Sequence, residues 1–148
     1  MDTLDVMNKT EDEGGKKRRK ELEELLIELR ERGCEMRIGG GQAGGINFRY
    51  GSIGYSILDV NTAGQVKLYA AAHPGKDAPE EFRDGVNAFI ADREELTPKS
   101  FPIQSYGHLE DPIEEIGAGP LIEFGEHVID LIRKHYYEPW QEESHGVG

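Results

Sequence analysis

Residues 46–71 of the 148-residue chain, INFRYGSIGYSILDVNTAGQVKLYAA, contain three stretches in which apolar and polar side chains alternate. Alternation with a period of two is typical of half-buried β-strands. Tyr50-Gly51-Ser52 predicts a turn after the first strand, and Asn61-Thr62-Ala63-Gly64 predicts a hairpin loop with a left-handed glycine. We therefore expect an antiparallel meander. The apolar members of its strands are Ile46, Phe48 and Tyr50, then Ile53, Tyr55 and Ile57, then Val66, Leu68 and Ala70.

Three amphipathic helices are expected around this sheet. A leucine stripe with the spacing i, i+3, i+4, i+7 predicts a helix over residues 17–33 that ends at Gly33. Two further apolar stripes predict helices after residue 77 and over residues 120–137. Short strands are expected at 35–38 and 101–106. The residues of the three stripes are Leu22, Leu25, Leu26 and Leu29, then Phe82, Val86, Phe89 and Ile90, then Leu121, Phe124, Val128, Leu131, Ile132 and His135.

These elements predict an α+β fold with an N-terminal helix, an antiparallel meander sheet of three to five strands, and two later amphipathic helices packed on one sheet face. Residues 16–140 are expected to form this single domain. Residues 1–15 are polar, lack periodicity and end in two glycines, which predicts a disordered tail. Residues 141–148 are polar and predict a loose C-terminal tail.

The chain is acidic, with 29 Asp and Glu against 17 Lys and Arg and a net charge of −12. Domains that bind a phosphate backbone are typically basic, so we do not expect nucleic acid as a partner. Residues 16–20, Lys-Lys-Arg-Arg-Lys, are a local exception. This basic segment either contacts a partner or forms a solvated helix start braced by i, i+4 pairs such as Arg19 with Glu23.

Cys34 is the only cysteine, which excludes an intramolecular disulfide and zinc sites built from several cysteines of one chain. It follows a predicted helix end, where the helix dipole disfavours a thiolate, so we do not expect it to be a nucleophile. No apolar run approaches the ~20 residues of a membrane-spanning helix. The first residues do not resemble a secretory signal. We expect a cytoplasmic protein without a membrane segment.

Asp59 and the later Gln65-Val66-Lys67 form the sharpest enzymatic candidate. The spacing resembles that of metal-dependent nucleases of the restriction-enzyme superfamily, in which two acids hold Mg²⁺ and a lysine helps to activate water. Gln65 stands where that pattern has its second carboxylate. The resemblance also implies a sheet with a helical crossover, whereas residues 53–71 predict a tight hairpin. The alternative is that Asp59 enters the turn and Lys67 faces solvent from a strand.

His108 is the histidine that best fits an enzyme, with Glu110 and Asp111 as partners in general-base chemistry. Glu123 and His127 lie one helical turn apart, but no third ligand stands at a recognisable metal-site spacing. We therefore predict no metal and no cofactor.

The glycine-rich segment 39–45 invites comparison with a phosphate-binding loop. It lacks the Gly-Lys-Ser or Gly-Lys-Thr ending of such loops, and a strand rather than a helix is expected to follow it. A connecting loop is the simpler interpretation.

The sequence favours a non-catalytic, protein-binding module of the adaptor or chaperone kind. Its order of helix, strands and helices, its mass and its acidity resemble those of small acidic secretion chaperones. That resemblance implies a protein partner or a homodimer, held on the open sheet face or at an apolar edge. The alternative is a divergent metal-dependent nuclease-like domain that uses Asp59 and Lys67, or an enzyme centred on His108. A third hypothesis, an acidic mimic of nucleic acid, fits less well because the acids mostly flank amphipathic helices.

Overall fold

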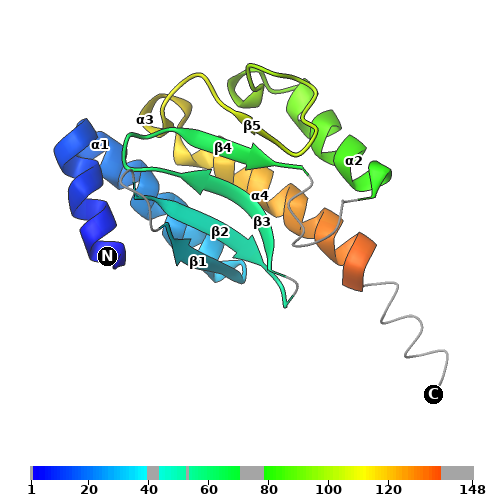
Figure 1. The fold of residues 1–148 in the computed structure, drawn as a ribbon, viewed down its shortest axis with the longest axis horizontal. Helices are drawn as coiled ribbons and strands as arrows, with labels where there is room; N and C mark the ends of the chain where they lie inside the picture. Colours follow the sequence, from blue (N-terminus) through cyan, green and yellow to red (C-terminus); the bar gives the residue numbers. More distant parts are fainter. Residues whose placement is uncertain (1, 40–43, 53, 71–78, 138–148) are drawn as a thin grey trace.

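The computed structural model describes residues 2–39, 44–52, 54–70 and 79–137 (Figure 1). The helices are α1 (Thr3–Glu31), α2 (Glu80–Ala91), α3 (Ile113–Ile116) and α4 (Ala118–Ile132), with a 3-10 turn at Glu94–Leu96 and a π-helical turn at Arg133–Tyr137. The strands are β1 (Cys34–Ile38), β2 (Ile46–Tyr50), β3 (Tyr55–Val60), β4 (Val66–Tyr69) and β5 (Tyr106–His108).

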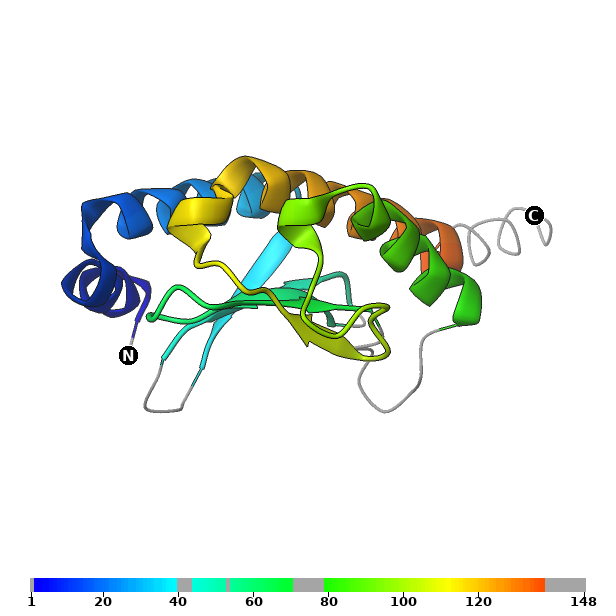
Figure 2. The same cartoon turned by 90° about the horizontal axis from the view of Figure 1, so that it is seen from above.

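The five strands lie in their sequence order, and every neighbouring pair is antiparallel. Figure 2 shows α2, α4 and the longer part of α1 on one side of this sheet, with α4 contacting both of the other helices. The molecule therefore has two layers, one of helices and one of strands. The predicted α+β fold, with its meander sheet and its helices on one face, is confirmed.

The core lies between the two layers, because each helix turns one apolar stripe toward the sheet. The stripe residues that are fully or almost fully buried are Leu22, Leu25, Leu26 and Leu29 of α1, Phe82, Val86 and Ile90 of α2, and Leu121, Phe124, Val128 and Ile132 of α4. Phe89, Leu131 and His135 of the predicted stripes are only partly buried.

Strand β3 departs from simple alternation. Its pairing with β2 is irregular between Phe48 and Arg49, and Ile57 has no partner in the register although its side chain is completely buried. This extra residue is a β-bulge, which shifts the side-chain alternation by one position. As a result Leu58, rather than Ile57, faces Phe48 on the helical side. Ile53, which we expected to begin this strand, lies outside the described residues.

Helix α1 begins at Thr3, although we expected a disordered tail over residues 1–15. Asp2 and Asp5 form a capping box, in which each backbone N–H donates to the other residue's carboxylate at 2.8 and 3.0 Å. Gly15, at φ 87°, breaks the helix into a short arm (residues 3–14) and a long arm (residues 16–31). Val6 is completely buried, so the short arm is held by packing that its polar composition did not indicate.

The two arginines of the basic segment 16–20 bind parts of the same chain. Arg18 pairs with Glu114 of α3 at 2.7 Å, and both side chains are largely buried. Arg19 pairs with Glu23 at 2.7 Å, as predicted, and donates to Asn8 of the short arm at 2.9 Å. The arginines thus explain much of this segment as a structural brace, whereas its three lysines are exposed.

Several predictions fall outside the described residues. These are the C-terminal tail 141–148 and the centre of the glycine-rich segment at 40–43. Within the described ranges, no helix has the length and apolarity that crossing a membrane requires.

Candidate functional site

The side of the sheet away from the helices is the candidate site, and we call it the open face (Figure 2). Side chains alternate between the two faces of a strand, so every second residue of a regular strand reaches this side, and in β3 the bulge makes these residues Ser56 and Asp59. The cross-strand register brings these residues into rows, for example Asn47 opposite Asp59, Asp59 opposite Lys67, and Lys67 opposite His108. The open face consists of Glu35 and Arg37 of β1, Asn47 and Arg49 of β2, Ser56 and Asp59 of β3, Lys67 and Tyr69 of β4, and Tyr106 and His108 of β5.

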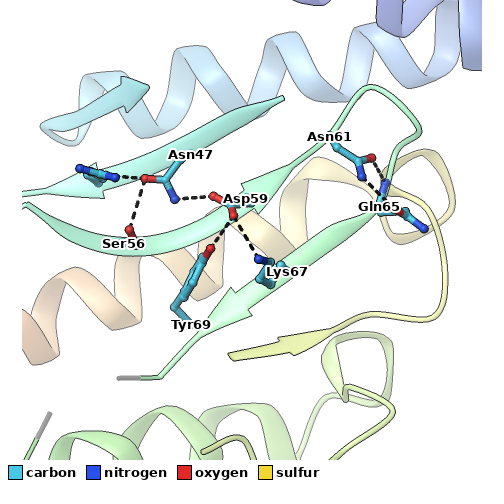
Figure 3. Close-up of polar contacts among 8 residues, drawn as sticks. Asn47, Ser56, Asp59, Asn61, Gln65, Lys67 and Tyr69 are labelled. Carbon is cyan, nitrogen blue, oxygen red and sulfur yellow. Dashed lines mark hydrogen bonds and ion pairs between the residues drawn. The ribbon is translucent and has the colours of Figure 1, made fainter. Parts of the chain in front are cut away.

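Asp59 is the centre of a polar network on the open face (Figure 3). Its carboxylate accepts hydrogen bonds from the Asn47 amide and, at 2.5 Å, from the Tyr69 hydroxyl. The Lys67 ammonium lies 3.8 Å from the same carboxylate oxygen that binds Tyr69. The network continues along β2, where the Arg49 side chain donates to the side-chain amide oxygen of Asn47 at 2.6 Å.

The charge of Asp59 also acts on Tyr69. Burial, followed by the hydrogen bond to Asp59, raises the pKa of Tyr69 well above its ordinary value. Tyr69 therefore stays protonated at neutral pH and serves as a donor to Asp59. The side chains of Asp59 and Lys67 are 28% and 29% exposed, so the network is in contact with solvent rather than sealed in the core.

Aromatic side chains flank this network on β4 and β5. The Lys67 ammonium lies 4.7 Å from the centre of the Tyr106 ring and 5.4 Å from that of Tyr69, which is within the range of a cation–π interaction. The His108 ring meets the Tyr106 ring edge to face, with 5.7 Å between centres. Tyr106 is 53% exposed, which is unusual for a large aromatic side chain. One end of the open face therefore presents aromatic, cationic and imidazole groups together.

A cavity of about 300 Å³ opens beside this network. It lies where the start of β2, the end of β3 and the start of β4 meet, and Asn61 and Gln65 close one side with a hydrogen bond of 2.8 Å. Its polar lining offers one ammonium, one carboxylate, one imidazole and three side-chain amides. The residues that line it are Gly39, Gly44, Gly45, Ile46, Asn47, Asp59, Val60, Asn61, Gln65, Lys67 and His108.

The structure brings all three candidate catalytic residues, Asp59, Lys67 and His108, onto adjacent strands at this cavity. Gln65, at the position of the missing carboxylate, is hydrogen-bonded to Asn61. Among the described residues, no group of three or more His, Cys, Asp or Glu side chains is placed to hold a metal ion. The sheet is a meander at this point, without the crossover that the nuclease resemblance implies.

The other histidine candidates have structural contacts instead. His127 shares a 3.1 Å hydrogen bond with the Gly85 carbonyl oxygen and stacks on Phe89 with 4.5 Å between ring centres. His135 packs edge to face on Phe82, as a histidine on an apolar stripe was expected to do. His108 lies opposite Lys67 of β4 and contacts Tyr106 of its own strand, and none of its described contacts is to Glu110 or Asp111.

Cys34 is buried at the start of β1, with 5% of its surface exposed. Burial raises the pKa of its thiol to about 12, with a small opposing effect from Arg32. The thiol is therefore neutral at physiological pH, which agrees with the expectation that Cys34 is not an activated nucleophile.

The buried thiol predicts a loss of stability at alkaline pH. The thiol ionises near pH 9 in the unfolded chain, whereas in the folded protein it keeps its proton up to about pH 12. Cys34 therefore does not lower the free energy of unfolding below pH 9, but it lowers this free energy progressively as the pH rises from 9 toward 12. Cys34→Ala should reduce the loss in free energy of unfolding between pH 9 and pH 11 by about 2 kcal/mol. Urea titrations at several pH values measure this difference. Equal pH dependence in both proteins would contradict it.

The groups that the open face presents around its centre are aromatic rings, a lysine and amides. Its central carboxylate, Asp59, is already bound by neighbouring side chains. Asn47, Tyr69 and Tyr106 belong to the open face but were not singled out from the sequence, although the alternation around Asn47 and Tyr69 placed them on a polar strand face.

Comparison with known proteins assigns no family, because no family model, no curated protein and no solved structure matches the chain significantly.

Proposed function

We propose that this protein is a non-catalytic protein-binding module whose partner lies across the open face. The observation that carries the proposal is the combination of an exposed Tyr106 with a polar network whose members already hold one another in place. Side chains fixed in this way lose little conformational entropy when a partner covers them. Tyrosine is also among the residues that contribute most to protein interfaces.

The hydrogen bonds of Asp59 argue against a catalytic use of this carboxylate. A general base or a metal ligand needs a lone pair directed at its substrate or ion. The carboxylate oxygens of Asp59 instead accept hydrogen bonds from Asn47 and Tyr69 and form an ion pair with Lys67. A nuclease would also need a second acid beside it, and Gln65 supplies an amide. These contacts favour an interaction surface over an active site.

The charge of the open face indicates the kind of partner. Its formally charged side chains are three cations and two acids, in a chain whose net charge is −12. An acidic protein segment therefore meets less repulsion here than over the rest of the surface. Lys67 and its two tyrosines are the groups best placed to contact such a segment.

A site-specific photo-crosslinker tests the proposal. Placed at Tyr106 in cells that express the protein, it should yield a discrete crosslinked product with another protein. The same group at Ala88, an exposed position of α2 in the helical layer, is the matched control and should not. Lys67→Glu should abolish the Tyr106 product. Equal products at both positions, or none at Tyr106, would refute the proposal.

Thermal unfolding with and without millimolar MgCl₂ separates this function from the nuclease alternative. A ligand that binds the folded state raises the melting temperature. We expect equal shifts for the wild-type protein and Asp59→Asn, because Mg²⁺ then acts only on the general negative charge. A shift that Asp59→Asn removes would instead favour a metal-dependent enzyme.

A further inference from the structure

Strand β1 forms one edge of the sheet, and its pairing leaves the other side of the strand unoccupied. It pairs with β2 alone, and no other described element adds to the sheet beyond it. Edge strands expose a row of backbone donors and acceptors that readily pair with another strand. The other edge is formed by β5, which has only three residues. β1 has five and is therefore the longer free edge.

The hydrogen bonding of β1 determines which of its backbone groups point outward. Gly39 N–H donates to the Gly45 carbonyl at 2.9 Å, in the same register that pairs Arg37 with Asn47. In an antiparallel ladder, hydrogen-bonded and non-hydrogen-bonded pairs alternate. Arg37 and Glu35 therefore direct their backbone groups toward β2. Cys34, Met36 and Ile38 direct theirs away from the sheet, toward solvent.

We propose that β1 pairs antiparallel with β1 of a second copy of this chain, with Met36 on the two-fold axis. In this register Met36 is opposite Met36 of the second copy, and Cys34 is opposite Ile38. All three residues then exchange backbone hydrogen bonds through the groups that point outward. On the open face, Glu35 lies opposite Arg37 in both halves of the interface. The two sheets become one sheet of ten strands.

Charge selects this register over its neighbours. A shift by two residues in one direction places Glu35 opposite Glu35, and a shift in the other direction places Arg37 opposite Arg37. Both arrangements set like charges directly across from one another, which is destabilising, whereas opposite charges stabilise a cross-strand pair. A shift by one residue would match outward-facing backbone groups with inward-facing ones and turn the side chains to the wrong faces.

The same two-fold axis also determines how the helices of the two copies lie relative to one another. A two-fold axis perpendicular to the sheet keeps both sets of helices on one side and makes the two α1 helices antiparallel. The basic segment 16–20, at the start of the long arm, then approaches the end of the long arm of the other copy. That end carries the exposed acid Glu31 and the exposed base Arg30. Charge complementarity therefore lies in the sheet layer, between Glu35 and Arg37, and the net charge of −12 per chain opposes association at low ionic strength.

Charge reversal tests the register by sedimentation equilibrium at physiological ionic strength. The wild-type protein should dimerise, and Glu35→Arg or Arg37→Glu should each weaken the dimer about tenfold or more, because two attractive pairs become repulsive. The double variant Glu35→Arg, Arg37→Glu should restore the affinity to within about threefold, since the pairs are re-formed with exchanged signs. Glu123→Arg and Lys99→Glu, at exposed positions elsewhere, control for the change in net charge. Circular dichroism checks that every variant is folded.

Crosslinking tests the position of the axis. In a Cys34→Ala background, Met36→Cys should form an intermolecular disulfide on mild oxidation, because residues paired across a hydrogen-bonded site lie about 5.5 Å apart between Cα atoms. Glu35→Cys in the same background should not, since the two copies of residue 35 are offset along the strands.

A strictly monomeric wild-type protein would overturn the proposal. So would a dimer that all reversals leave intact, a double variant that fails to recover, or preferential crosslinking at residue 35. The proposal does not depend on the function assigned to the open face, because Lys67→Glu is expected to leave the dimer unchanged while it abolishes the crosslink from Tyr106.

Discussion

Gly45→Ala is expected to lower the free energy of unfolding by about 3 kcal/mol, because an alanine at this position is both strained and obstructed. The backbone of Gly45 has φ +135°, a conformation that residues other than glycine rarely adopt. A Cβ atom there would lie 2.9 Å from the Asn61 Cα atom and 2.9 Å from the Val60 carbonyl oxygen. Both are backbone atoms of β3 and its following turn, so they cannot move aside without distorting the sheet beside the cavity.

Gly54→Ala provides the matched control for Gly45→Ala. Gly54 also has a positive φ, of +66°, but a Cβ atom there meets nothing within 4 Å. This substitution should cost only the conformational penalty of about 1 kcal/mol. Equilibrium unfolding in urea, followed by circular dichroism, measures both values. If the two variants lose the same free energy of unfolding, the close approach of Gly45 to β3 is not the reason that a glycine is needed at this position.

The fold followed from the sequence wherever one local period governed a segment. The leucine spacing of α1 and the alternation of β2 and β4 needed no knowledge of distant partners. The contact between Asp59 and Lys67 follows from the expected hairpin for the same reason, because a short hairpin fixes which residues face one another. The conformation of Gly64, at φ +82°, agrees with the turn expected there.

The candidate site was less accessible because it depends on pairing between distant segments. His108 faces Lys67 only because β5 joins β4 from about forty residues along the chain, and no local pattern specifies that register. The bulge at Ile57 was hidden because an apolar residue also follows it, so the shift in phase left no mark in the hydrophobic pattern. The short arm of α1 was missed because Val6 and Met7 are two apolar residues in a segment that is otherwise mostly polar. Its one sequence indication was the spacing of Asp2 and Asp5.

The crossing of α1 and α4 leads to the second large effect. Leu29 is completely buried on α1, and a Cβ atom on Gly125 of α4 would lie 2.7 Å from its Cδ2 atom. The glycine therefore allows α4 to pack closely against the leucine. Leu29→Ala should destabilise the protein by about 3 kcal/mol, because it removes buried contacts and leaves a cavity that a packed helix pair cannot fully close.

The effect of Gly125→Ala on the free energy of unfolding should have opposite signs in the wild-type protein and in the Leu29→Ala variant. In the wild-type protein the added methyl group collides with Leu29, and this overpacking outweighs the gain in helix propensity, for a net loss of about 1 kcal/mol. With Leu29→Ala in place the methyl group fills part of the cavity, and the helix propensity of alanine also favours the folded state. The same substitution should then stabilise the protein by about 1 kcal/mol, which is a coupling of about 2 kcal/mol between the two positions.

Gly119→Ala is the control for this cycle, because Gly119 lies in the first turn of α4 with nothing within 4 Å of a Cβ atom. It should have the same effect in both backgrounds. Urea unfolding of the four proteins of the cycle and of the two controls gives all the free energies needed. A Gly125→Ala effect that is independent of residue 29 would mean that the helices do not meet at this point. The helical layer, and with it the contact of α1 with β1, would then have to differ from the structure described.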